Sequence, residues 1–469
     1  MSHVIGPGNP GGQDNLDLDK LVKQYRKAIR NRPNDGGLHH DLGLVYMQKG
    51  EPKKAIGAFK QSLKLQPDMT QARYFLGVAH AEAGDIEAAE TEWKQVVSEE
   101  PDHAMSHYFL GWINTARSEW ETAIEYLERA RDLDADQPQM YHALAEAYMG
   151  ALRHMDAIRA WRRVVEMNPG DMRARHNVGA ALYDQGFYDE AIKVGKETME
   201  MGSDSPIPRV NVALAHLAKN ELEEAEKYMT EALELAPDDL DARVNLGEIL
   251  ARQGKLDEAC GAWEAVLERA PDHPDALFNL GQAARMRGDI DSALRHWDRA
   301  LTVAGNLPDE IGAAYEAQLR GNKALVLMAA GRYEEALEEC LASAEKNPGE
   351  PMNWNRAAMV CLSAGWYDRA SGYLDRADHS DDETNLGTLF IRGSMEILEG
   401  RPRRGAVRWM EVLEREPNAP ASVKTQLAAV LSASDLGEVA RDLEEDGHRQ
   451  EADAVREFLG VLASGDERR

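Results

Sequence analysis

The strongest constraint on the fold is a small residue that returns every 34 positions along the chain. It stands third in windows such as NLGEILARQGKLDEA at 245 and NLGQAARMRGDIDSA at 279. We call this residue the marker. Its first eight positions are Gly43, Gly77, Gly111, Ala145, Gly179, Ala213, Gly247 and Gly281. A constant period of this length predicts a repeat protein, in which each unit stacks on the next and the core lengthens with every copy.

Other residue types keep fixed distances from the marker. A turn-forming residue usually stands seven positions after it, alanine stands twelve after it, and proline often stands twenty-four after it. A bulky residue usually stands sixteen after the marker, and we call this the seam position: Phe59, Trp93, Leu127, Trp161, Met229, Trp263 and Trp297. We interpret each unit as two antiparallel helices of about twelve residues, joined by short turns at the glycine and at the proline.

These residue types have a physical role in such a unit. The marker and the alanine let two helix backbones approach closely, and the bulky side chain fills the seam toward the next unit. Proline ends a helix because it has no N–H to donate within it. The tryptophans at seam positions are therefore expected in the core: Trp93, Trp161, Trp263, Trp297 and Trp409.

With this period and these residues at these offsets, the chain resembles the tetratricopeptide-repeat family. The resemblance implies an all-α fold: a right-handed superhelical solenoid whose first helices line a concave groove that holds peptides or protein partners. The 34-residue spacing of these positions, which we call the grid, is interrupted once and resumes with markers Ala324, Ala358 and Gly393, which gives eleven repeats. Cap helices are expected at both ends.

The grid also predicts how the chain is divided. We expect a disordered tail over 1–15, a capping helix over 16–35 and repeats 1–8 over 36–307. Repeats 9–11 follow over 308–419, and 308–316 extends the first helix of repeat 9. Residues 420–469 then form capping helices and a tail.

The fifth repeat departs from the pattern. Gly195 stands at its seam position, and KETMEMGSDSPIP replaces the usual proline junction. An underfilled seam is expected there. Two alternatives remain open: a hinge involving Gly195 and 202–208, or closure of the gap by neighbouring side chains.

Charge limits the choice of partners. The formal net charge is −28, and no block dense in Lys or Arg is present, so nucleic acids and anionic membranes are poor candidates. Neutral or basic proteins are favoured. The sequence has no apolar run long enough to span a membrane and only three cysteines, which predicts a soluble cytoplasmic protein with reduced thiols.

No catalytic motif is recognisable. GPGNPG at 6–11 matches a nucleotide-binding pattern only by letters, because it follows no strand and opens no helix. His40, His142 and His176 share one offset, yet only the last two lie on neighbouring repeats, and two ligands make a poor zinc site. We therefore expect no enzyme activity, no cofactor and no metal.

The polar feature that points to function is asparagine two positions before the marker, at Asn177, Asn211, Asn245, Asn279 and Asn322. In tetratricopeptide-repeat proteins such as O-GlcNAc transferase, asparagines at the matching place line the groove and hold an extended peptide by its backbone. The resemblance implies the same use here. Alternatively, asparagine is simply common at this position in the family and contacts no ligand.

The first repeats carry aromatic residues, which are expected at the N-terminal end of the groove: Tyr74, Phe75, Tyr108, Phe109 and Trp112. They suit anchoring of an apolar or proline-rich partner side chain. Packing against the capping helix is the alternative.

Together these features predict a non-catalytic scaffold or adaptor that receives partner segments along its concave face. Two alternatives are a structural protein that assembles with itself as a homo-oligomer and a regulatory subunit of an enzyme complex. The sequence leaves open whether the groove binds the chain's own tail.

Overall fold

The computed structural model describes residues 18–133, 137–378, 386–416 and 433–463, and the regular secondary structure in these ranges is helical throughout. The chain forms two compact units, Met1–Asp238 and Asp239–Arg469. The expected N-terminal tail over 1–15, part of the C-terminal cap over 420–432 and the final residues 464–469 lie outside the described ranges.

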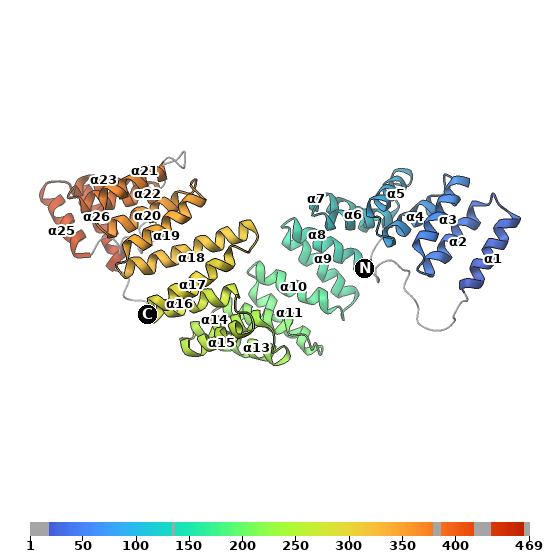
Figure 1. Ribbon diagram of the computed structural model, residues 1–469, viewed down its shortest axis with the longest axis horizontal. Coiled ribbons are helices and arrows are strands. Elements are labelled where there is room, and N and C mark those ends of the chain that lie inside the picture. The colour runs from blue at the N-terminus through green and yellow to red at the C-terminus, as the bar shows by residue number, and fades with distance from the viewer. Residues whose placement is uncertain (1–17, 134–136, 379–385, 417–432, 464–469) are drawn as a thin grey trace. The chain divides into compact units, whose positions relative to one another are not determined.

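The first unit contains thirteen of the described helices (Figure 1). They are α1 Leu18–Asn31, α2 Gly36–Gln48, α3 Pro52–Leu65, α4 Thr70–Glu82, α5 Ile86–Glu99, α6 Ala104–Ala116, α7 Trp120–Asp132, α8 Pro138–Gly150, α9 His154–Met167, α10 Met172–Asp184, α11 Tyr188–Glu200, α12 Ile207–Ala218 and α13 Leu222–Leu235.

The second unit contains the remaining described helices. They are α14 Leu240–Arg252, α15 Leu256–Arg269, α16 Pro274–Met286, α17 Ile290–Ala304, α18 Asp309–Ala329, α19 Tyr333–Lys346, α20 Pro351–Ser363, α21 Tyr367–Asp378, α22 Leu386–Leu398, α23 Pro402–Arg415, α25 Ala433–Glu445 and α26 Arg449–Ala463.

Consecutive helices pair as hairpins, from α2 with α3 to α22 with α23. Within each unit the second helix of a hairpin also packs on the first helix of the next, as α3 does on α4 and α19 on α20. The predicted fold class, an all-α tetratricopeptide-repeat solenoid of eleven hairpins with further helices at both ends, is confirmed.

The turn inside each hairpin reverses the chain through a left-handed residue seven positions after the marker. Glycine occupies this position in most repeats, with φ between 67° at Gly50 and 86° at Gly84. Repeat 4 has Leu152 instead, with φ 59°. Its N–H donates to the Met149 carbonyl at 3.0 Å, and the N–H of the next residue, Arg153, donates to the Tyr148 carbonyl at 2.8 Å. These two hydrogen bonds form a Schellman motif, which glycine favours because it has no Cβ.

The small residues sit where two helices touch. Alanine twelve positions after the marker is fully buried in repeats 1–10, from Ala55 to Ala370. A Cβ added at the marker Gly77 would lie 2.5 Å from Nε1 of Trp93. With no side chain in the way, that Nε1–H donates to the Tyr74 carbonyl at 3.2 Å. Glycine at position 77 lets the indole of Trp93 lie directly on the backbone of the first helix.

All five seam tryptophans are buried, which confirms their predicted place in the core. Trp263, Trp297 and Trp409 repeat the hydrogen bond of Trp93 to a first-helix carbonyl, at 3.1 to 3.2 Å. Trp161 differs, because its marker is Ala145 and its buried Nε1 has no partner in the described structure. One methyl group at the marker is thus associated with the loss of this hydrogen bond.

The prediction of an underfilled seam at Gly195 is wrong. A Cβ added to Gly195 would lie 2.3 Å from Cγ2 of Val212 and 3.2 Å from the Pro208 carbonyl oxygen. Helix α12 therefore fills the space that a bulky residue occupies in other repeats. Of the two alternatives, closure of the gap by neighbouring side chains agrees with the structure.

Helix α18 has 21 residues, against 12 to 15 for the helices around it. The segment 308–316 lies at its start. From this segment the Tyr315 hydroxyl donates to the Pro274 carbonyl at 2.7 Å, so the added turns pack toward α16.

No helix in the described ranges is both long enough and apolar enough to cross a bilayer.

Candidate functional site

Within each unit the first helices form one layer. Several consecutive first helices contact one another: α2 and α4, α6 and α8, and α10 and α12 in the first unit. The second unit shows the same for α14 and α16, α18 and α20, and α20 and α22. Consecutive second helices make no contact of this extent among the described residues of the repeats. Because the layer with closer neighbours lies inside a bend, the first helices form the concave side of each unit.

Helix geometry tells which residues face this side. At about 100° per residue, the positions six and two before the marker and one and five after it fall within a sector of about 60°. We call these four positions the inner face. The asparagines predicted to hold a partner occupy the second of them.

The structure leaves all five asparagines half-buried. Asn177 and Asn211 lie on α10 and α12 of the first unit; Asn245, Asn279 and Asn322 lie on α14, α16 and α18 of the second. The side-chain N–H of Asn211 donates to the His176 carbonyl at 3.5 Å, and that of Asn322 donates to the Gln318 carbonyl at 3.1 Å. A carboxamide has two N–H donors and an acceptor oxygen, so neither bond uses all the hydrogen-bonding groups of the side chain.

The position two before the marker lies over the seam of the preceding repeat. Phe75 stacks on the seam residue Phe59, with ring centroids 6.1 Å apart. Phe109 stacks on the seam residue Trp93, with centroids 4.6 Å apart and an interplanar angle of 12°. This position therefore forms the boundary between the core and the inner face. The relation joins two repeats, so it is not visible in the sequence of one.

The predicted aromatic residues pack mainly on one another. Tyr108 and Phe109 are buried, with 7% and 3% of their surface exposed, whereas Tyr74, Phe75 and Trp112 are half-buried. The Tyr74 ring lies 5.0 Å from that of Phe75 and 4.8 Å from that of His103. Burial raises the pKa of Tyr74 to about 12. Phe75 and Phe109 lie against seam residues of the preceding repeats, and whether these rings also contact a partner stays a prediction.

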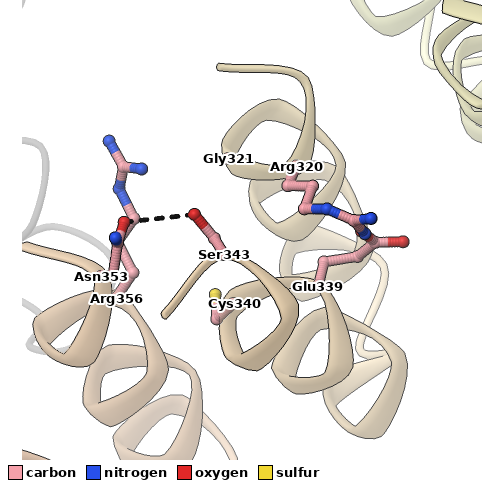
Figure 2. Close-up of a pocket in the computed structure, with 7 residues that line it drawn as sticks. All are labelled: Arg320, Gly321, Glu339, Cys340, Ser343, Asn353 and Arg356. Carbon is pink, nitrogen blue, oxygen red and sulfur yellow. Dashed lines mark hydrogen bonds and ion pairs between the residues drawn. The ribbon is translucent and has the colours of Figure 1, made fainter. Parts of the chain in front are cut away.

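Sequence reasoning missed a position in repeats 9 and 10. Two before the marker Ala358 stands Arg356, the equivalent of the five asparagines, and the seam residue of repeat 9 is Cys340 instead of a bulky group. A shallow pocket lies between α18, α19 and α20 (Figure 2). Its lining residues are Arg320, Gly321, Glu339, Cys340, Ser343, Asn353 and Arg356. The pocket is shallow and has no enclosed room for a water molecule.

Figure 2 shows two sides of this pocket. On the α18 side, Figure 2 shows Arg320 beside Glu339, to which its Nη1 donates at 2.7 Å. Nε of Arg320 also donates to Glu316 at 2.7 Å. Lys346 also bonds Glu316. Burial raises the pKa of Glu316, but the hydrogen bonds from these cations outweigh it and lower the pKa overall.

On the α20 side, Asn353 accepts a hydrogen bond from the Ser343 hydroxyl at 3.3 Å. Arg356 is exposed and makes no hydrogen bond or ion pair within the described part of the chain. Both the position and the small seam residue could have been found from the grid. The search for repeated asparagine overlooked them because arginine breaks that pattern.

Family models describe the sequence as tetratricopeptide repeat. One matches residues 40–96, 79–138, 142–206 and 288–351, another matches 238–305 and a third matches 216–259. Together they cover more than half of the chain. The chain therefore belongs to the tetratricopeptide-repeat family.

Several solved structures are similar. Yeast Tom70 is 14% identical with a TM-score of 0.45, and the match covers 82% of this chain and 93% of Tom70. MamA is 30% identical with a TM-score of 0.32, over 34% of this chain and 93% of MamA. A structure of Naa15/Naa10 bound to HypK-THB is 13% identical with a TM-score of 0.40, over 92% and 79%. A search of curated proteins found no match.

Proposed function

We propose that this protein is a non-catalytic scaffold or adaptor that holds extended partner segments on the inner face of its first helices. Proteins of this family generally serve as interaction scaffolds. The observation that carries the proposal is the asparagine two positions before the marker in five repeats, half-buried at the edge of the inner face in each.

The spacing suits an extended guest. Packed helices lie about 8 to 10 Å apart, and an extended chain advances about 3.3 to 3.6 Å per residue, so one asparagine meets roughly every third residue. Each carboxamide can pair with a backbone C=O and an N–H of the guest. One net hydrogen bond contributes about 1 kcal/mol, so the asparagines supply a few kcal/mol and side-chain contacts supply the rest.

The partner is a neutral or basic protein. The chain carries a net charge of −28, and on α14 the inner-face residue Asp241 has an 89% exposed side chain. A negative field accelerates the capture of basic segments and does so most at low salt. The three cysteines are buried free thiols, which fits a reducing compartment, and we place the protein in the cytoplasm.

The test replaces Asn245, Asn279 and Asn322 together with alanine in the full chain. Partners that co-purify with the wild-type protein are first identified by mass spectrometry, and the affinity for the tightest one is then measured. We expect affinity to fall about tenfold or more, because three paired amides are removed.

A matched control replaces Asn31, Asn34 and Asn306, which are exposed and lie at helix ends, with alanine. Circular dichroism verifies that both triple variants keep their helices. Equal affinity of the wild type and the inner-face variant would remove the asparagines from the mechanism.

Light scattering over a range of protein concentrations separates the scaffold from the self-assembling alternative. An enzyme that co-purifies in fixed proportion would favour the regulatory subunit.

A further inference from the structure

We propose that the inner face of repeats 9 and 10 selects a partner segment with a carboxylate side chain beside an apolar one. The carboxylate binds Arg356, and the apolar side chain lies against Leu325 and Met352. This inference rests on the proposed function, because it names the kind of segment that the first helices hold at one place.

Arg356 is available to a ligand. It is exposed, its guanidinium lies beside Gly321, where an added Cβ would be 3.3 Å from Nη1, and no described carboxylate pairs with it. Two nearby arginines of the unit are paired: Arg320 bonds Glu316 and Glu339, and Arg392 bonds Asp375 and Asp378. A guanidinium presents a planar fork of donors that matches a carboxylate with two parallel hydrogen bonds.

Apolar side chains flank this guanidinium on the same face. Leu325 follows the marker Ala324 by one position and is 56% exposed. Met352 precedes the marker Ala358 by six positions and is 48% exposed. Leu325 lies one turn from Gly321 on α18, and Met352 lies one turn from Arg356 on α20, so both stand next to the contact between Gly321 and Arg356. A partner side chain that covers them gains the free energy of apolar burial.

The inner-face positions of α18 and α20 contain no acid to repel a carboxylate. The inner-face positions of α18 and α20 hold Gln318, Asn322, Leu325, Ala329, Met352, Arg356, Met359 and Ser363. On α14 the same positions include Asp241 and Glu248. In a chain with a net charge of −28, two successive first helices thus expose amides, apolar groups and one unpaired cation on this face.

The seam residue beneath this cation is small. Where the seam residue is Trp93, the side chain above it stacks on the ring and is buried. Cys340 and Gly321 offer no such ring, and the pocket between them is too shallow to take in a ligand group. The guest carboxylate therefore binds at the mouth of the pocket, where Asn322 is the neighbouring polar group of the inner face.

The probe for this inference is a phage-displayed library of random linear peptides selected on the immobilised full chain. Enriched sequences are synthesised as acids, as Asp→Asn or Glu→Gln counterparts, and with an amidated C-terminus. Their affinities are measured for the wild type, for Arg356→Gln and for a matched control, Arg285→Gln. Arg285 is an exposed first-helix arginine of the same unit that already donates to Gln282 at 2.9 Å.

We expect enriched peptides to carry an Asp or Glu close to an aliphatic residue. Removing the peptide carboxylate and removing Arg356 should each weaken binding about fivefold or more, and the two changes together should cost no more than one. Arg285→Gln and C-terminal amidation should leave the affinity unchanged.

Peptides that bind the wild type and Arg356→Gln equally, yet lose affinity for the inner-face asparagine variant, would overturn this inference and leave the proposed function intact. Dependence on the terminal carboxylate alone would also overturn it, as would concentration-dependent self-association that Arg356→Gln abolishes, because the occupant would then be a second copy. A library without any binder would contradict both proposals.

Discussion

Repeats 3 and 10 use the position two before the marker in opposite ways. In repeat 3 this residue is Phe109, which stacks on Trp93 at 4.6 Å and has 3% of its surface exposed. In repeat 10 it is Arg356, which lies above Cys340 and is exposed without a partner. The comparison teaches that the same position of the repeat can pack on the core in one repeat and stay available to a partner in another.

The largest expected difference concerns stability. Phe109→Ala should lower the free energy of unfolding by about 3 kcal/mol, because it removes a buried ring and leaves a cavity on Trp93. Arg356→Ala should change it by less than about 0.5 kcal/mol, because an exposed, unpaired side chain is lost. Urea denaturation followed by circular dichroism measures both.

Equal losses for the two variants would show that Arg356 also packs. The comparison between a packing and a binding position would then fail.

A second pair of variants tests the glycines beside the two seams. Gly77→Ala places a methyl group 2.5 Å from Nε1 of Trp93 and interferes with its hydrogen bond to the Tyr74 carbonyl, so we expect a loss of about 2 kcal/mol. Gly321→Ala meets only the flexible end of Arg356 at 3.3 Å. Alanine also favours a helix over glycine, so this variant should be neutral or up to about 0.5 kcal/mol more stable.

Thermal denaturation ranks these two variants, and Gly179→Ala serves as a control because its Cβ would meet only Nδ2 of Asn211 at 3.6 Å. A loss at Gly321 as large as at Gly77 would contradict an open seam in repeat 9.

The smallest expected effect is a pH dependence. Burial raises the pKa of the Cys340 thiol from 9.0 to about 12, so the folded protein favours the neutral thiol. The unfolded chain releases this proton above about pH 9, hence stability is lost as the pH rises from there toward 12. Between pH 8 and 10 the wild type should lose about 1 kcal/mol more than Cys340→Ala.

Tyr74 beside the closed seam behaves differently. Its pKa is raised from 10.0 to about 12, so its contribution falls only above pH 10. Urea denaturation at pH 8, 9 and 10 tests whether the contribution of Cys340 is lost at a lower pH than that of Tyr74. An identical pH dependence of the wild type and Cys340→Ala would contradict the burial of that thiol.

The sequence alone was enough to predict the repeat fold because each hairpin is stabilised by local contacts at fixed offsets. Ala89 and Trp93 stand four residues apart in the sequence, and both indicate that two helices pack closely. The structure buries both completely. Gly195 could not be interpreted in this way. Its space is filled by Val212 from the next repeat, and one repeat's sequence does not show what its neighbour contributes.

The same limit applies to the candidate site. The asparagine series can be found by counting residues from the marker in the sequence, but the stacking of Phe109 on Trp93 depends on packing between repeats. Arg356 stands on the same grid as the asparagines, yet its importance appears only when the exposed guanidinium, the small Cys340 and the exposed Met352 are seen together. Whether the asparagines contact a guest stays a prediction.

The central claim is that partners bind the inner face of the first helices, and site-specific photo-crosslinking tests it most directly. A photoreactive phenylalanine derivative replaces Leu325 on the inner face or, as the matched control, Val407 on the second helix α23, which is 50% exposed against 56% for Leu325. The cross-linked peptides are then sequenced from cells that express each variant. We predict that position 325 captures one recurring partner segment that contains an Asp or Glu, while position 407 captures none in common. Equal capture at both positions, or a recurring segment at 407 alone, would contradict the account.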